Sequence, residues 1–179
     1  MSELSNILSG FRQNVFEPNI DFSDKLPDAQ GNYLFCLRAG STFPITNITP
    51  KFSRFDGFEV IYTGIASKSF RDRDYKSHFG NSAGKSTLRK SLGVLFGYNQ
   101  IPRGKNPYSG KTKFSDVDEL NLTVWMKVNL LMFYFVNLDW ELDEIQLIGY
   151  FNPPLNLKDN HNKENLEFRQ LLKNLRAKR

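Results

Sequence analysis

The chain of 179 residues contains one cysteine, Cys36, and two histidines, His78 and His161. A single cysteine cannot form an internal disulfide, and Cys36 lies in a strand-like apolar run, which predicts a buried apolar residue. The histidines lie far apart and have no cysteine or histidine partner at ligand spacing, which argues against a zinc site. No serine or cysteine stands in a recognisable nucleophile motif. A disulfide scaffold is therefore excluded, and a zinc enzyme or a serine or cysteine hydrolase is disfavoured.

Long apolar runs are also missing. No apolar stretch approaches the roughly 20 residues that a membrane-spanning helix needs, and residues 1–10 lack the basic start and apolar core of a signal peptide. We therefore expect a cytoplasmic protein with no membrane partner. The apolar content of 40% and the aromatic content of 14% are those of a globular chain, and the length suits one domain with a sizeable core.

Charged residues are unevenly distributed. Residues 65–113 hold eleven Lys and Arg but only two Asp, and residues 114–157 hold seven acids but one Lys. Residues 158–179 again hold seven basic residues against three acids. Two basic blocks around an acidic one indicate a polyanionic partner and a separate place for a cation. The alternative is a solvated mixed-charge surface, because a pI of 9.3 is ordinary.

Hydrophobic periodicity predicts an α+β chain. Strand-like runs occupy residues 31–37, 58–66 and 130–136, and the first two are expected to pair antiparallel across the long connection 39–57. Helical patterns occur within residues 1–30, at 68–79 and 86–96, from 115 onward, and at 139–151 and 163–177. In the helix that begins at Ser115, the residues expected to face inward are Val117, Leu120, Val124 and Val128.

The second strand carries the first chemical signature. It contains Tyr62 and Gly64, and a basic segment with Arg71, Arg73 and His78 follows. This set suits a phosphate, because Arg presents a planar fork of donors while Tyr and His can pass protons. A turn with a packed aromatic ring is the alternative for a Tyr-x-Gly sequence.

Residues 80–86 resemble the phosphate-binding loop of nucleoside triphosphatases. That motif needs four residues between its glycines and a buried strand before it, whereas three residues separate Gly80 from Gly84 and a helix precedes them. We interpret the segment as a basic loop that caps a helix.

Two polar residues stand out near the end of the acidic block. Glu144 lies in the middle of a helix, where a carboxylate that packs against a sheet often binds a metal or has a shifted pKa, although most helical glutamates are solvated. Asn156 follows Pro153 and Pro154, where asparagine more often stabilises a turn than performs chemistry.

Taken in order, these residues resemble the GIY-YIG nuclease family. Gly31, Asn32 and Tyr33 stand for the first signature tripeptide, and the second runs from Tyr62 to Gly64; the middle residue of each departs from the family pattern. The later family positions correspond to Arg73, with Arg71 as its rival, to His78, which lies one residue further along than the pattern expects, and to Glu144 and Asn156. The resemblance covers about residues 31–157, and the helix at 86–93 resembles a bacterial standalone branch of the family.

The resemblance implies a small three-stranded antiparallel sheet flanked by helices. It places a nuclease domain at 31–157, between an N-terminal helical extension, 1–30, and a basic C-terminal helix, 158–179. It also implies an endonuclease that hydrolyses phosphodiester bonds in DNA with one divalent metal, Mg²⁺ or Mn²⁺. A non-catalytic nucleic-acid-binding module of the same fold is the first alternative, and a structural protein with an incidental basic face is the second.

Site residues follow from the same resemblance. Glu144 would hold the metal, and the expected catalytic residues are Tyr33, Tyr62, Arg73, His78, Glu144 and Asn156. Contacts with the DNA backbone are expected from Arg71, Lys85, Arg89 and Lys90, which lie in the basic block.

Overall fold

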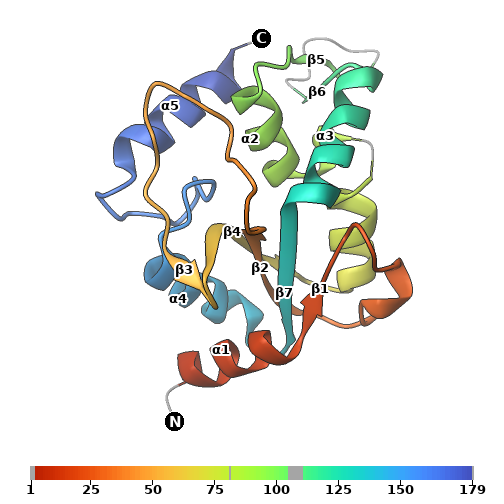
Figure 1. Cartoon of the computed structure of the whole chain (residues 1–179), viewed down its shortest axis with the longest axis vertical. Coiled ribbons are helices and arrows are strands. Elements are labelled where there is room, and N and C mark those ends of the chain that lie inside the picture. The colour runs from red at the N-terminus through yellow and green to blue at the C-terminus, as the bar shows by residue number, and fades with distance from the viewer. Residues whose placement is uncertain (1–2, 81, 105–110, 179) are drawn as a thin grey trace.

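Three long antiparallel strands form the centre of the computed structural model, which describes residues 3–80, 82–104 and 111–178, with the side chains of 3, 73 and 74 left out. β2 (Gly31–Leu37) lies between β4 (Phe58–Ala66) and β7 (Leu130–Val136) and pairs with both (Figure 1). Two short strands, β1 (Val15–Phe16) and β3 (Arg54–Phe55), extend the sheet to the order β1-β7-β2-β4-β3.

The α+β class is therefore confirmed, but the sheet has five strands within the described residues rather than three. The added strands are two residues long, which is too short to leave a periodic pattern in the sequence.

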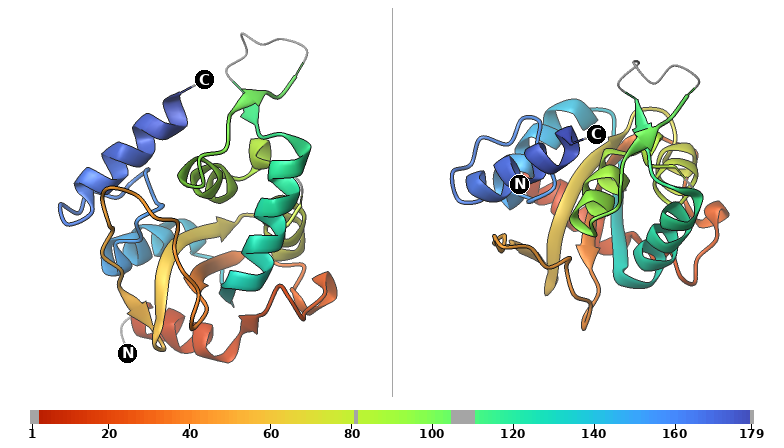
Figure 2. Two further views of the ribbon diagram at one scale, coloured as in Figure 1. Left: turned by 45° about the horizontal axis from the view of Figure 1, so that its top comes forward. Right: turned by 90° about the horizontal axis from the view of Figure 1, so that it is seen from above.

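Helices cover both faces of this sheet, as the right-hand view of Figure 2 shows. α1 (Glu3–Gln13) and α4 (Trp140–Phe151) pack on one face. The π-helix η2 (Arg71–His78), α2 (Thr87–Leu95) and α3 (Asp116–Asn129) pack on the other, and α5 (Leu166–Ala177) packs against α2. The remaining elements are η1 (Ser23–Lys25), η3 (Ala83–Lys85) and a hairpin of β5 (Ile101–Pro102) with β6 (Thr112–Lys113). No helix within the described ranges is both long and apolar enough to cross a bilayer.

The side chains of β2 alternate between the two faces. Tyr33 and Phe35 belong to the core on the α2 and α3 side, whereas Leu34 and Cys36 belong to the core on the α1 and α4 side. Cys36 is buried as expected, and burial raises the pKa of its thiol. The alternation therefore sends the signature tyrosine toward η2 and α2.

Several helix ends follow the sequence signals. α2 begins directly after Ser86, whose Oγ accepts the Arg89 N–H at 3.1 Å. α4 ends at Phe151, its cap Asn152 adopts the left-handed conformation, and the diproline follows. α5 begins at Leu166, three residues later than expected.

Helix α3 is turned the opposite way from the prediction. The four aliphatic residues expected to face inward are 55–68% exposed: Val117, Leu120, Val124 and Val128. Leu122 and Met126 are fully buried instead, next to the polar residues Glu119 and Thr123. The four aliphatic residues do form a stripe on one face of α3, but a polar interaction of the opposite face determines which face is buried.

That interaction is an ion pair between α2 and α3. The guanidinium of Arg89 is fully buried and donates to Glu119 Oε2 from Nη2 at 2.6 Å and from Nε at 3.2 Å. Its Nη1 donates to the His78 carbonyl at 3.0 Å and to Thr123 Oγ1 at 2.9 Å. Burial lowers the pKa of Arg89, while the hydrogen bond and charge of Glu119 raise it. The expectation that Arg89 contacts DNA is therefore wrong, because its donors are used inside the protein.

The other oxygen of Glu119 holds two loops. Its Oε1 accepts the N–H of Ala83 at 2.7 Å and that of Phe114 at 3.2 Å. Both oxygens of Glu119 thus accept hydrogen bonds, which a charged group in the core needs because its burial is otherwise very costly. The pair therefore fixes the segment between η2 and α2 as well as the face of α3.

The orientation of α3 can be tested with two leucines of that helix. Leu122→Ala should lower the free energy of unfolding by about 2–5 kcal/mol, because it leaves a cavity in the core. Leu120→Ala, at a 55% exposed position, should change it by no more than about 0.5 kcal/mol. Urea denaturation of both variants measures the difference. A larger loss of unfolding free energy for Leu120→Ala would support the orientation predicted from the sequence, in which Leu120 faces inward.

The ion pair makes a second prediction. Glu119→Gln should lower the free energy of unfolding by about 3–5 kcal/mol, because the charge of Arg89 then stays buried without its partner. The matched control is Glu59→Gln, which removes an exposed pair with Arg54 at 3.3 Å and should cost about 1 kcal/mol or less. Equal denaturation midpoints for the two variants would contradict the importance given to the buried pair.

Candidate active site

The two signature tripeptides lie on the paired strands β2 and β4 and meet at their ends. Tyr33 lies opposite Gly64, and a Cβ at position 64 would come within 2.5 Å of the Tyr33 hydroxyl oxygen. A Cβ at Gly31 would come within 2.0 Å of the Phe135 carbonyl oxygen on β7. Each glycine therefore makes room for a neighbour, and Gly64 does so for the tyrosine of the other signature.

The hydroxyl of Tyr33 begins a buried chain of hydrogen-bonding groups. It lies 2.8 Å from Nε2 of His78, and Nδ1 of His78 lies 2.6 Å from Oγ of Ser86. All three residues are buried. Because phenol, imidazole and hydroxyl groups can each donate and accept, this chain can carry a proton between β2 and the start of α2. Ser86 is a member that the sequence reasoning missed; its only signal was its position as the helix cap.

The π-helix accounts for the position of His78. In an α-helix, residues five apart differ by about 140° in direction, whereas π-helical hydrogen bonds join residues five apart. η2 therefore takes up the extra residue between Arg73 and His78, and His78 still reaches Tyr33. The side chain of Arg73 lies outside the described residues, and its contribution stays a prediction.

Arg71, the rival of Arg73, binds the N-terminal segment. Its Nε donates to the Ser23 carbonyl at 3.2 Å, and its Nη2 donates to the Leu26 carbonyl at 3.1 Å. The half-buried Arg71 therefore connects η2 with the segment around η1. This structural contact accounts for an arginine at position 71 without any contact to a phosphate.

Asn156 joins the loop after α4 to the second signature. Its Oδ1 accepts the Thr63 N–H at 3.0 Å, and its Nδ2 donates to the Thr63 carbonyl at 2.9 Å. Thr63 Oγ1 in turn donates to the Tyr33 carbonyl at 2.9 Å. Asn156 is 5% exposed, and both of its side-chain polar atoms hold the loop in place.

A second set of amides places α4 against β2. Asn32 Nδ2 donates to the Trp140 carbonyl at 2.9 Å, and Asn137 Nδ2 donates to Asn32 Oδ1 at 2.9 Å. Asn137 also donates to the carboxylate of Asp143, which is buried. Asp143 therefore helps to hold the start of α4 in place. Its neighbour Glu144 is the carboxylate that lines the cavity described next.

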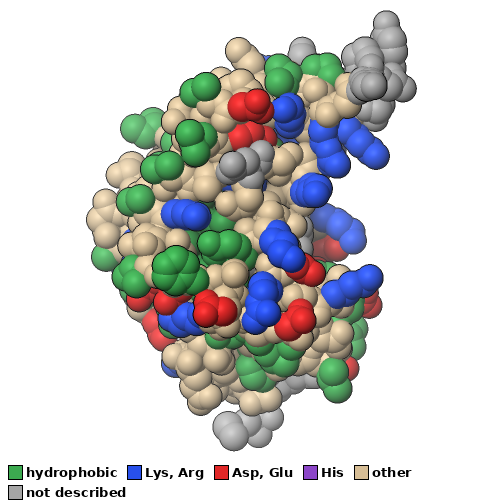
Figure 3. Space-filling model, turned by 90° about the vertical axis from the view of Figure 1, so that its right-hand side faces the viewer, with side chains coloured by type: hydrophobic (Ala, Val, Ile, Leu, Met, Phe, Trp, Pro, Cys, Tyr) green, Lys and Arg blue, Asp and Glu red, His purple; other side chains and the backbone are tan. Residues whose placement is uncertain are grey.

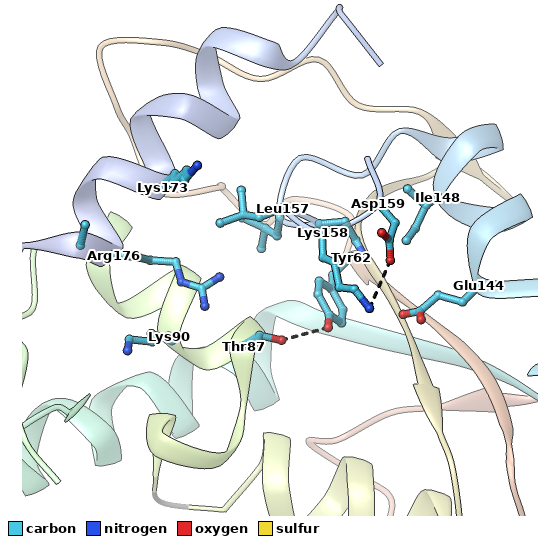
Figure 4. A pocket seen from close by; sticks show the side chains of 13 residues that line it. Tyr62, Thr87, Lys90, Glu144, Ile148, Leu157, Lys158, Asp159, Lys173 and Arg176 are labelled. Carbon is cyan, nitrogen blue, oxygen red and sulfur yellow. Dashed lines mark hydrogen bonds and ion pairs between the residues drawn. The ribbon is translucent and has the colours of Figure 1, made fainter. Parts of the chain in front are cut away.

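Tyr62 and Glu144 line one cavity of about 620 Å³, shown in Figure 4. The Tyr62 hydroxyl lies 3.0 Å from Thr87 Oγ1. The other labelled residues of the lining are Lys90 from α2, Ile148 from α4, Leu157, Lys158 and Asp159 from the following loop, and Lys173 and Arg176 from α5. A basic wall thus stands across the cavity from Glu144.

The sequence predicts residues 158–179 as an extension of the domain, whereas in the structure Lys173 and Arg176 line the cavity. Burial lowers the pKa of Arg176, and its charge interaction with Tyr62 raises it. The guanidinium is therefore within electrostatic reach of the phenol. The basic composition of the last block was a signal for this contribution, but only the fold brings α5 to the signature strand.

The cavity offers oxygen ligands to a hard cation. Glu144 and Asp159 both line it, and Asp159 forms an ion pair with Lys158 at 3.4 Å. Among the residues that the structure describes, no three His, Cys, Asp or Glu side chains gather as a multidentate metal site. Mg²⁺ does not require one, because it keeps several waters and takes one or two carboxylates together with substrate phosphates. The donor set around Glu144 therefore fits this ion.

Five of the six predicted catalytic residues form two adjoining groups. Tyr33 and His78 lie in the interior, and Tyr62, Glu144 and Asn156 line the cavity. The Tyr62 ring joins them, since its centroid lies 6.3 Å from the Tyr33 and His78 rings.

Two of the expected DNA-contacting residues have suitable positions. Lys85 is exposed, and Lys90 lies half-buried in the cavity wall. Figure 3 shows Lys and Arg side chains gathered along a hollowed edge of the molecule. Arg71 and Arg89 contribute to internal contacts instead.

The family model for the GIY-YIG catalytic domain matches residues 31–178. Comparisons with curated proteins and with solved structures give no match. The matched region starts at the first signature glycine and includes α5, which supplies Arg176 to the cavity. Since the match spans most of the chain and contains both signature strands, the chain belongs to the GIY-YIG nuclease family.

Proposed function

We propose that the protein is a metal-dependent endonuclease that hydrolyses phosphodiester bonds in DNA. The observation that carries this proposal is the cavity in which Tyr62 and Glu144 face the cations of α2 and α5. Cleavage of a phosphodiester requires charge neutralisation at the phosphate, a positioned water and a stabilised leaving oxygen. The cavity combines a basic wall, a phenol and a carboxylate for these tasks.

Glu144 would hold the metal, Mg²⁺ or Mn²⁺, which when bound supplies a Lewis acid for the phosphate and its leaving oxygen. Lys90 and Arg176 neutralise the negative phosphate from the opposite wall. Arg73, from η2, is assigned to the charge that develops on the phosphate during cleavage. The loop that carries Lys158 stays in place through Asn156.

Tyr62 positions the attacking water, because its hydroxyl belongs to the cavity lining. A phenol with an ordinary pKa of about 10 is a weak base at neutral pH. A positive charge beside a phenol favours its ionised form, and Arg176 lines the same cavity as Tyr62. Tyr33 is fully buried and lies against Tyr62. Its hydrogen bond with His78 gives the interior a group that can accept or return a proton.

The alternative is a non-catalytic nucleic-acid-binding module of the same fold. The basic wall suits both functions, since cations bind phosphates with or without cleavage. A binding module, however, has no use for a carboxylate beside the phosphate, because that charge repels its ligand. The position of Glu144 in the cavity favours the enzyme.

Glu144→Gln tests the proposal directly. The substitution keeps the shape of the side chain but removes the charge that holds a hard cation, so nicking of supercoiled plasmid with Mg²⁺ should fall by about a thousandfold or more. DNA binding without metal, measured by fluorescence anisotropy, should persist or tighten slightly. The matched control is Glu141→Gln, an exposed position one turn earlier on α4, which should nick at nearly the wild-type rate. A wild-type rate for Glu144→Gln would refute the assignment of the metal to this residue.

The two arginines of η2 give a second test. Arg73→Ala should abolish cleavage while leaving the unfolding midpoint nearly unchanged. Arg71→Ala should retain a measurable rate and instead lower the midpoint, because the carbonyls of Ser23 and Leu26 lose their donors. Rates from plasmid nicking and midpoints from thermal denaturation separate the two effects. Loss of cleavage in Arg71→Ala without destabilisation would exchange the assignments.

A further inference from the structure

A smaller cavity, of about 330 Å³, adjoins the active-site cavity. The two have three lining residues in common, Thr87, Lys90 and Arg176. Figure 4 shows Lys90 and Arg176 at the end of the active-site cavity that is remote from Glu144. The smaller cavity therefore continues the site on the side away from the carboxylate.

The lining of this cavity is cationic. It contains Lys85, Lys90, Lys111 and Arg176, and no carboxylate lines it among the described residues. Thr87, the first residue of the nine-residue helix α2, also lines it, so the positive end of the helix dipole adds to the side-chain charges. Such a lining attracts an anion and offers nothing to a metal ion.

One side of the cavity is formed by residues 83–86, the second half of the segment that resembles a phosphate-binding loop in the sequence. Its backbone is held from several sides: Glu119 accepts the Ala83 N–H at 2.7 Å, and Arg103 Nη1 donates to the Gly84 carbonyl at 2.5 Å. Ser86 Oγ accepts the N–H of Arg89 as the cap of α2. Residues 83–86 are thus held in place by contacts that do not involve a ligand.

We infer that this cavity is a second phosphate subsite, which binds a backbone phosphate next to the one that is cleaved. Phosphate groups follow one another along a nucleic acid strand, and two adjoining cavities that each have lysine and arginine side chains in their linings provide for two of them. Arg176 lies in both linings and can serve both phosphates with its fork of donors. That the second phosphate belongs to a DNA strand rests on the proposed function; the binding of a phosphate does not.

The test uses thymidine 3′,5′-bisphosphate and thymidine 5′-monophosphate as probes, titrated calorimetrically into the full chain without metal at low salt. The wild type should bind the bisphosphate about tenfold or more tightly than the monophosphate, because a second phosphate then gains charge-assisted contacts. In the double variant Lys85→Gln, Lys111→Gln this ratio should fall close to one. Both lysines are exposed, so the variant should fold normally.

The control is the double variant Lys113→Gln, Lys127→Gln, which removes the same amount of charge outside both linings. Lys113 pairs with Asp116 at 3.0 Å, and Lys127 lies over the Tyr75 ring. This variant should keep the wild-type ratio. An unchanged ratio in the Lys85 and Lys111 variant, or equal binding of the two probes by the wild type, would overturn the subsite.

Plasmid nicking by the wild type with Mg²⁺ tests the proposed function separately. A protein that shows the expected ratios but does not nick DNA keeps the phosphate subsite and loses the nuclease assignment. A protein that nicks DNA but binds both probes equally keeps the nuclease assignment and loses the subsite.

Discussion

The buried contact between Arg89 and Glu119 is the constraint on which the site side of the molecule depends. It satisfies two opposite charges in the core, and each partner also holds backbone groups: the carbonyl of His78 on one side and the N–H groups of Ala83 and Phe114 on the other. A buried pair of this kind tolerates few geometries, because every donor and acceptor must be matched. The position of the His78 imidazole, the start of α2 and the rotation of α3 are consequently set together.

The site consists of a dry part, which is closed to solvent, and an open part, which faces it. The dry part is the series of Tyr33, His78 and Ser86, where proton-bearing groups contact one another without access to solvent. The open part is the cavity of Tyr62 and Glu144, where charges of both signs face a ligand. β4 belongs to both parts, because its Gly64 packs against Tyr33 in the dry part and its Tyr62 lines the cavity.

The sequence is sufficient to predict much of this fold. β2 and β7 appear as continuous apolar runs because both faces of the central sheet are covered, and α2 and α4 carry clear start and stop signals in Ser86 and Pro153. The orientation of α3 is not predictable in the same way, because its exposed stripe is as aliphatic as its buried one. The choice depends on Arg89, a charge that sequence patterns place at the surface and that only a specific partner allows into the core. The contribution of Arg176 to the cavity cannot be predicted from the sequence for a different reason, because it depends on how α5 packs against α2.

The place of α5 in the site also bears on the order in which the molecule is completed. Tyr62 lies in β4, Glu144 in α4 and Arg176 in α5, so the cavity joins side chains from distant parts of the chain. Contacts between side chains this far apart in the chain close large loops, which costs conformational entropy. The basic wall that faces Glu144 is therefore in place only once α5 has packed against α2.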